Sequence, residues 1–232
     1  MYRDLKNKNV ILTGGSGFLG SQIIKAFRAT KSNIIILDIK KPKKKLNFVK
    51  FYKCNISIEN EVKKVAKEIL RKYKKVDILI NNAASDYNPN KKQKDLSVGL
   101  DGAFICTKIF GSIMANKKKG AILNISSDLG IIAPNQELYK DTGFIKPVTY
   151  SVVKHGINGL TKYTASYWAN KNVRCNAIAP GGILHNQNKK FLDKIKKVIP
   201  MKRLARKNEY NDLILFLCSD SSSYMTGSIV IA

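Results

Sequence analysis

The sequence predicts an α/β protein in which a doubly wound parallel sheet of about seven strands carries helices on both faces. Two observations support this prediction. Short apolar runs alternate with segments of helical periodicity along the 232 residues. Glycine-rich and polar motifs follow directly after these runs, at strand ends where such sheets bind ligands. No internal repeat or linker interrupts the pattern, so residues 1–232 are expected to form one domain.

The first strand–helix unit has the features of a nucleotide-binding turn. The apolar run Asn9–Thr13 is followed by the glycine-rich segment 14–20 and then by a helical pattern. Gly14 permits a tight turn, Gly17 lets backbone approach a pyrophosphate, and Gly20 allows close packing of helix on sheet. The N-terminus of that helix would then meet the phosphates. This order of elements predicts a Rossmann-type dinucleotide-binding fold.

The second strand, at 33–37, ends at an acidic residue, Asp38. An acidic side chain about 20 residues beyond the glycines can accept hydrogen bonds from the adenosine ribose hydroxyls. The same charge would repel a 2′-phosphate, so Asp38 favours NAD over NADP. Lys40 and Lys41 would soften this preference.

The remaining elements continue the alternation. Further strands are expected at 48–52, 76–80, 121–125, 173–178 and 228–231. Further helices are expected after a Ser57 N-cap and at 96–114, 150–168 and 210–218. A polar loop is expected at 85–94 and a solvated turn at the lysine cluster 40–45.

Tyr150 and Lys154 are the candidates for acid–base chemistry. They are four residues apart on a predicted helix and therefore project from one face. A phenol is a poor base near neutral pH, because its ordinary pKa is about 10. A nearby ammonium favours the phenolate and lowers that pKa, so the pair can exchange a proton with an alcohol or ketone. The same spacing is also typical of a purely structural helix, and Ser127 can equally be a turn residue.

With these motifs assembled, the sequence resembles the short-chain dehydrogenase/reductase family over essentially its whole length. The resemblance rests on TGGSGFLG at 13–20, Asp38, NNAA at 81–84, ISS at 125–127, YSVVK at 150–154, NAIAPGG at 176–182 and YMTG at 224–227. It implies that Ser127 holds the substrate oxygen, that Tyr150 is the acid/base, and that Lys154 binds the nicotinamide ribose and tunes Tyr150. The cofactor contacts that it implies are Gly14, Ser16, Gly17, Phe18, Leu19, Asp38, Asn55, Ile56, Asn81, Ala83, Lys154, Pro180, Gly181 and Ile183.

Some residues depart from the typical family pattern. Phe18 occupies a position where classical members of the family usually have a glycine, and the resulting glycine pattern resembles that of extended members that act on nucleotide sugars. Segment 131–147 lengthens the interval between Ser127 and Tyr150. Gly99 replaces an asparagine whose backbone carbonyl holds a relay water in the family. Within the family, the sequence is most similar to oxidoreductases of flagellin-glycan and nonulosonate sugar pathways.

Composition argues against several other classes of function. The net charge is +26, but only six of the 42 basic residues are arginine, so a specific nucleic-acid surface is not expected. Such a charge would still attract an anionic substrate. The four cysteines are widely separated, which favours a reduced cytoplasmic protein and no metal site. No apolar run approaches the roughly 20 residues that span a bilayer, and no signal segment is expected.

The sequence therefore predicts an NAD-dependent oxidoreductase that transfers a hydride between nicotinamide and a hydroxyl or ketone of a sugar-like, anionic substrate. A homodimer or homotetramer is expected, because helices 96–114 and 150–168 carry surplus apolar surface. One alternative is a nucleotide-sugar epimerase or dehydratase with transient NAD oxidation, although only 52 residues follow Pro180 to form a substrate domain. Another is a non-catalytic NAD-binding or basic interaction protein, against which the retained Ser127, Tyr150 and Lys154 argue.

Overall fold

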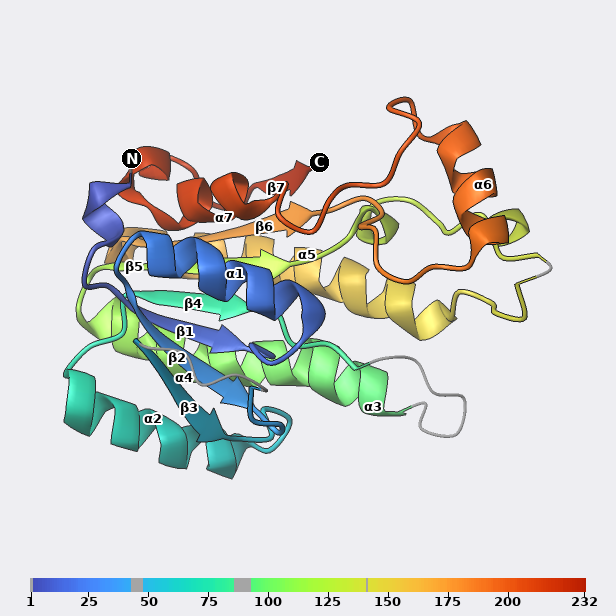
Figure 1. The fold of residues 1–232 in the computed structure, drawn as a ribbon. Coiled ribbons are helices and arrows are strands. Elements are labelled where there is room, and N and C mark those ends of the chain that lie inside the picture. Colours follow the sequence, from blue (N-terminus) through green and yellow to red (C-terminus); the bar gives the residue numbers. More distant parts are fainter. Residues whose placement is uncertain (1, 43–47, 86–92, 141) are drawn as a thin grey trace.

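Seven parallel strands form one sheet in the order β3-β2-β1-β4-β5-β6-β7 in a computed structural model of the chain, which describes residues 2–42, 48–85, 93–140 and 142–232 (Figure 1). The strands are β1 Asn9–Thr13, β2 Asn33–Asp38, β3 Val49–Lys53, β4 Ile78–Asn81, β5 Gly120–Ile125, β6 Val173–Ala179 and β7 Ile229–Ile231. The doubly wound parallel sheet is confirmed. The predicted polar loop at 85–94 and the lysine cluster at 40–45 lie largely outside the described residues.

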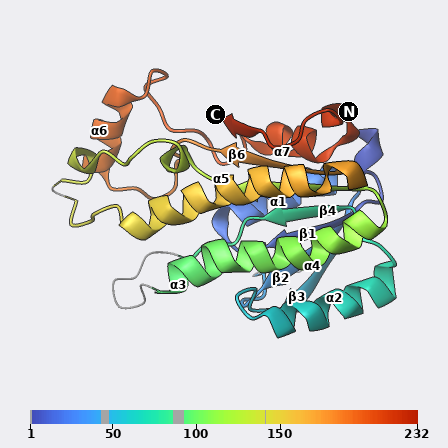
Figure 2. The same ribbon diagram turned by 180° about the vertical axis from the view of Figure 1, so that it is seen from behind.

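Helices cover both faces of the sheet. They are α1 Phe18–Ala29, α2 Glu59–Tyr73, α3 Gln93–Leu96, α4 Gly102–Asn116, α5 Val148–Trp168, α6 Lys189–Val198 and α7 Asn211–Cys218. α1 and α7 pack on one face, whereas α2, α4 and α5 cover the other (Figures 1 and 2). Side chains alternate between the two faces, so Val10 and Leu12 join one core while Ile11 joins the other. Strands buried on both faces explain the continuous apolar runs in the sequence.

The chain reverses its direction of winding between β1 and β4. It runs from β1 outward to β2 and β3, and then from β4 to β7 on the other side. In such sheets the crevice at the strand ends binds ligands. Gly14 lies directly beside this point with a φ of 66°, and a Cβ there would meet the Ala83 backbone at 2.7 Å. Only glycine fits this turn without strain.

The predicted cap of α2 is wrong, and one helix was not predicted. Ser57 does not cap α2: the N-cap is Ile58, and the Ser57 hydroxyl donates to Asn55 Oδ1 at 2.8 Å. Glu61 then accepts a hydrogen bond from the Asn55 amide at 2.7 Å, which ties the loop to the helix. Helix α6 was not predicted, because its many lysines make the short apolar pattern of residues such as Phe191 and Ile195 hard to recognise in the sequence.

The expected helix at 96–114 begins earlier and is irregular. It starts as α3 and passes through a π-helical turn, Ser97–Asp101, before α4. Gly99 lies in this turn, and a Cβ there would approach Val153 Cγ1 of α5 at 2.7 Å. By length and composition, the stretch Ser97–Asn116 is apolar enough to cross a bilayer, although no single apolar run in the sequence is that long. Half of its most apolar window is buried within this protein, as in the core helix of a soluble protein.

Candidate active site

A broad cleft of about 1880 Å³ runs along the carboxyl ends of the strands. Its walls come from the turn after β1, the ends of β2, β4, β5 and β6, segment 131–147 and α6. Typical small-ligand pockets measure about 300–1,000 Å³. The cleft is therefore large enough for a dinucleotide together with a substrate.

The cleft brings together every predicted site residue except Asn81. The residues that line it include Gly14, Ser16, Gly17, Phe18, Leu19, Asp38, Asn55, Ile56, Ala83, Ser127, Tyr150, Lys154, Pro180, Gly181 and Ile183. Asn81 faces the core instead, where its Nδ2 donates to Thr107 Oγ1 at 2.9 Å and to Asn124 Oδ1 at 2.8 Å. Its neighbour Asn82 lines the cleft, and its side chain donates to the Thr13 and Gly14 carbonyls.

The glycine-rich turn offers backbone donors to an anion. Gly17 is the N-cap of α1 and supplies no capping side chain, so the first amides of the helix need another acceptor. Gly20 packs so closely on the turn that a Cβ would lie 2.4 Å from the Gly14 carbonyl oxygen. Open amides at the positive end of a helix suit a phosphate. The turn therefore fits a dinucleotide pyrophosphate.

Asp38 lies at the end of β2 and is held against this turn. Its Oδ2 accepts from the Ser16 amide at 3.0 Å, and its Oδ1 accepts from the Lys40 amide at 3.0 Å. The Ser16 hydroxyl donates to the Lys40 carbonyl at 2.6 Å, which closes the arrangement. Each carboxylate oxygen has a further lone pair, so both hydroxyls of a ribose have an acceptor here.

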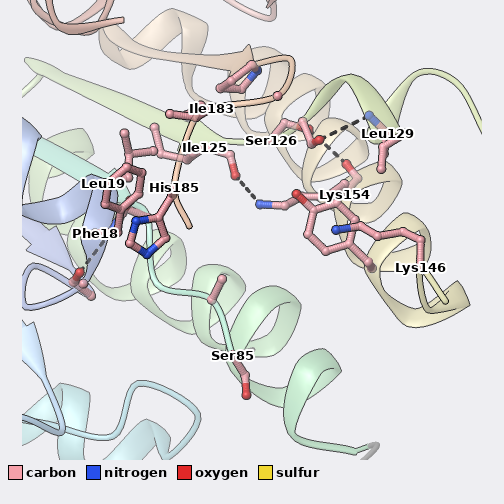
Figure 3. Close-up of a pocket in the computed structure, with 18 of the residues that line it drawn as sticks. Phe18, Leu19, Ser85, Ile125, Ser126, Leu129, Lys146, Lys154, Ile183 and His185 are labelled. Carbon is pink, nitrogen blue, oxygen red and sulfur yellow. Dashed lines mark hydrogen bonds between the residues drawn. The ribbon is translucent and has the colours of Figure 1, made fainter. Parts of the chain in front are cut away.

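The predicted acid–base pair, Tyr150 and Lys154, lies on the first two turns of α5. Lys154 is only 8% exposed, and its Nζ donates to the carbonyl of Ile125, the last residue of β5, at 2.8 Å (Figure 3). The ammonium lies 5.6 Å from the centre of the Tyr150 ring. The sheet end therefore fixes the position of the cation relative to the phenol.

Burial shifts the pKa values of this pair in opposite directions. It lowers the pKa of Lys154 to about 8, with a further contribution from the nearby Lys146 charge. Burial raises the pKa of Tyr150 above its ordinary value, and Asp128 acts in the same direction while the Ser127 hydroxyl opposes them. The expected lowering of the Tyr150 pKa by Lys154 is therefore not found. Desolvation of the phenolate dominates, while the Lys154 ammonium is engaged by the Ile125 carbonyl.

Ser127 is buried next to Asp128, a partner that was not predicted from the sequence. Its hydroxyl donates to Asp128 Oδ1 at 2.7 Å and accepts from the Leu129 amide at 3.2 Å. The Leu129 amide also contacts Asp128 Oδ1 at 2.7 Å. Asp128 therefore orients the Ser127 hydroxyl. The only signal in the sequence was its position directly after the ISS motif.

Further unpredicted contacts complete the cleft. Phe18 stacks on His185 with ring centroids 3.9 Å apart, joining the glycine-rich turn to the segment after β6 (Figure 3). Tyr139 packs against Phe191 of α6 at 5.2 Å between centroids. Segment 131–147 and α6 therefore form one wall. Lys146 extends from this wall to the Tyr150 ring.

Known proteins resemble this chain over most of its length. A protein family described as "Enoyl-(Acyl carrier protein) reductase" matches residues 17–232. The chain is 30% identical to a 3-oxoacyl-(acyl-carrier-protein) reductase of Thermotoga maritima over 97% of this chain and 96% of that protein. It is 29% identical to the post-translational flagellin modification protein A of Campylobacter coli, over 98% and 97%. A short chain dehydrogenase from Leptospira borgpetersenii with bound NAD+ superposes with a TM-score of 0.92 at 28% identity, covering 100% of this chain and 93% of that one.

The burial of Lys154 predicts a dependence of stability on pH. Its pKa is about 8 when folded and 10.5 when unperturbed, so the unfolded chain binds more protons between these values. The free energy of unfolding of the parent, relative to Lys154→Met, should therefore rise by about 1–3 kcal/mol between about pH 7.5 and about pH 10. Denaturant titrations at several pH values measure this difference. A difference that stays constant with pH, as expected for an exposed control such as Lys117→Met, would contradict the burial of this charge.

Proposed function

The chain belongs to the short-chain dehydrogenase/reductase family, and from this premise we propose that it is an NAD-dependent oxidoreductase acting on a sugar-like, anionic substrate. The observation that carries the proposal is the placement of Ser127, Tyr150 and Lys154 in one cleft beside a dinucleotide-binding turn. Residues 1–232 would act as one unit, because the whole cleft is built on a single sheet. Each role below is part of the proposal.

The residues of the chain fit NAD. The glycine-rich turn and the α1 amides would hold the pyrophosphate, and Asp38 would accept from the adenosine ribose. Lys154 would hold the nicotinamide ribose from inside the cleft, since its Nζ lies at the end of β5. Bound nicotinamide supplies the hydride acceptor or donor. Asn82, rather than the predicted Asn81, lies at the wall of the dinucleotide site.

Proton transfer would be carried out by Tyr150. Its raised pKa keeps the phenol protonated at neutral pH, the form that donates a proton to a ketone oxygen. Ser127 would turn its hydroxyl from Asp128 towards the substrate oxygen and hold it next to the phenol. The Lys154 charge stabilises the phenolate that remains. Alcohol oxidation would need the phenolate form of Tyr150 to accept the hydroxyl proton, and the carbonyl at Gly99 in the π-helical turn would hold the relay water that carries this proton away.

The substrate class rests on charge and on the relatives. The net charge of +26 and the lysines in the cleft favour an anion. One relative is named for flagellin modification, which supports a surface-glycan sugar, and another for reduction of 3-oxoacyl carrier-protein esters. A substrate screen should therefore contain both classes. The buried, free cysteines support a cytoplasmic location.

Replacing Tyr150 by Phe tests the central role. The ring packing is kept and only the transferable proton is lost, so turnover should fall by about 10²–10⁴-fold while NAD affinity changes little. Lys154→Ala should lower NAD affinity as well, because it removes the ribose contact. The assay is NADH absorbance with sugar acids, phosphorylated sugars, nucleotide-linked sugars and acyl thioesters. Turnover at the parent rate by Tyr150→Phe would refute the mechanism.

Asp38 should determine the choice of cofactor. Asp38→Asn removes the charge but keeps an acceptor, so the preference for NAD over NADP should shrink by about tenfold. The measurement is the ratio of the NAD and NADP dissociation constants, because the asparagine can keep only one of the contacts to the Ser16 and Lys40 amides and this loss weakens both cofactors. If the parent binds NADP as tightly as NAD, the proposed role is incorrect.

We also expect the protein to form a homodimer or a homotetramer. α4 and α5 expose large apolar and aromatic side chains on their outer faces: Phe104, Val152, Tyr163 and Tyr167. Isologous pairing of such helices is a common way to cover them. Sedimentation at micromolar concentration and moderate salt should show an oligomer, and Tyr167→Asp should weaken it. A monomeric parent would rule out this assembly.

A further inference from the structure

Lys146 lies within the catalytic cleft, and the proposed reaction does not use it. It belongs to segment 131–147 and comes just before Pro147, the N-cap of α5. Its backbone is held on both sides by one side chain: Gln136 Nε2 donates to the Lys146 carbonyl at 2.9 Å, and the Lys146 amide donates to Gln136 Oε1 at 3.1 Å. These two hydrogen bonds fix the position of the Lys146 backbone, and therefore of its Cα atom, at the edge of the cleft.

The Lys146 ammonium lies over the face of the Tyr150 ring. Its Nζ is 3.7 Å from the ring centre, within the range of a cation–π contact. Across the described part of the chain, this ammonium forms no hydrogen bond and no ion pair. The ring face attracts the charge but leaves ammonium N–H groups without an acceptor. A half-buried cation in this state favours an anionic partner.

The surrounding charges also favour an anion. Among the described residues that line the cleft, the acidic ones are Asp38, at the adenosine end, and Asp128. Asp128 is not within ion-pair distance of Lys146, and its Oδ1 is occupied by Ser127 and Leu129. Lys146 and Lys154 therefore outnumber the single nearby carboxylate. The N-terminus of the long helix α5 adds a partial positive charge at the same point.

We propose that Lys146 is the anion-binding residue of the substrate subsite, pairing with a carboxylate or phosphate group that the substrate carries close to the reacting carbon. This rests on the proposed oxidoreductase function and deepens it. The proximity follows from the geometry, because the ammonium and the phenol oxygen belong to side chains in direct contact. A substrate with its anionic group far from the carbinol would not reach both.

The competing role for Lys146 is to tune Tyr150. An ammonium over the ring stabilises the phenolate, so its loss would slow proton transfer for every substrate and shift the pH profile of kcat. An anion-binding role predicts a loss confined to anionic substrates and expressed mainly in KM. The two roles therefore differ in measurable quantities.

The first experiment needs no turnover. Calorimetry measures the binding of malonate and of inorganic phosphate to the NAD+-loaded parent, to Lys146→Met and to Lys140→Met. Lys140 is a matched control, since it lies on the same segment but is exposed and does not line the cleft. The parent should bind at least one of the two anions, Lys146→Met at least about tenfold more weakly, and Lys140→Met within about twofold of the parent. Binding that is absent from the parent, or unchanged in Lys146→Met, overturns the proposal.

The second experiment uses one carbon skeleton in three charge states: sorbitol, gluconate and sorbitol 6-phosphate. Lys146→Met should lower kcat/KM by at least about tenfold for the anionic member that the parent prefers, leave sorbitol within about twofold, and recover in part in Lys146→Arg. The preferred anion distinguishes a carboxylate from a phosphate subsite. An equal loss for all three compounds with a shifted pH profile identifies Lys146 as a tuning residue and overturns the proposal.

The two levels of the proposal fail separately. If NADH forms but no anion binds through Lys146, the oxidoreductase function stands and the subsite is wrong. If malonate or phosphate binds through Lys146 but NADH forms with no compound, the subsite stands and the reaction is wrong. Unchanged thermal unfolding and NAD affinity of Lys146→Met establish that the variant is folded.

Discussion

The hydrogen bond from Lys154 Nζ to the Ile125 carbonyl is the interaction on which the site depends. It joins the end of β5 to the second turn of α5 inside the protein. Neighbouring contacts support it: Asn158 Nδ2 donates to the Gly130 carbonyl at 2.8 Å, and Gly130 packs so tightly that a Cβ would lie 2.9 Å from the Lys154 carbonyl. Ser127, in the segment that follows β5, and Tyr150, one turn before Lys154, are thereby held next to each other.

This burial determines how the site responds to pH. Desolvation disfavours both charged forms, so it keeps the Tyr150 phenol protonated while bringing the Lys154 pKa to about 8. Of these two side chains, Lys154 is therefore the one that gains or loses its charge near neutral pH. The Ile125 carbonyl keeps the Lys154 ammonium 5.6 Å from the centre of the Tyr150 ring. The packing of α5 on the sheet therefore sets the pKa shifts of both side chains.

The features that sequence alone could predict are those set by strand ends. Strands buried on both faces must be apolar runs, and polar motifs directly after them must lie at one edge of the sheet. Asn81 shows the limit of this reasoning. Adjacent residues of an extended chain point to opposite sides. The side chain of Asn81 therefore lies in the core, and Asn82 lines the cleft. Asp128, Lys146 and α6 were missed because their roles arise only from tertiary contacts.

The central claim is that Lys154 is buried, still ionisable and held at the end of β5, and an NMR titration tests it most directly. The Cε chemical shift of Lys154 is followed with pH in carbon-13-labelled protein, with the signal assigned by its absence in Lys154→Arg. The account predicts a midpoint of about 8. A midpoint at the ordinary lysine value of 10.5 would mean that the ammonium is solvated, and would contradict the account.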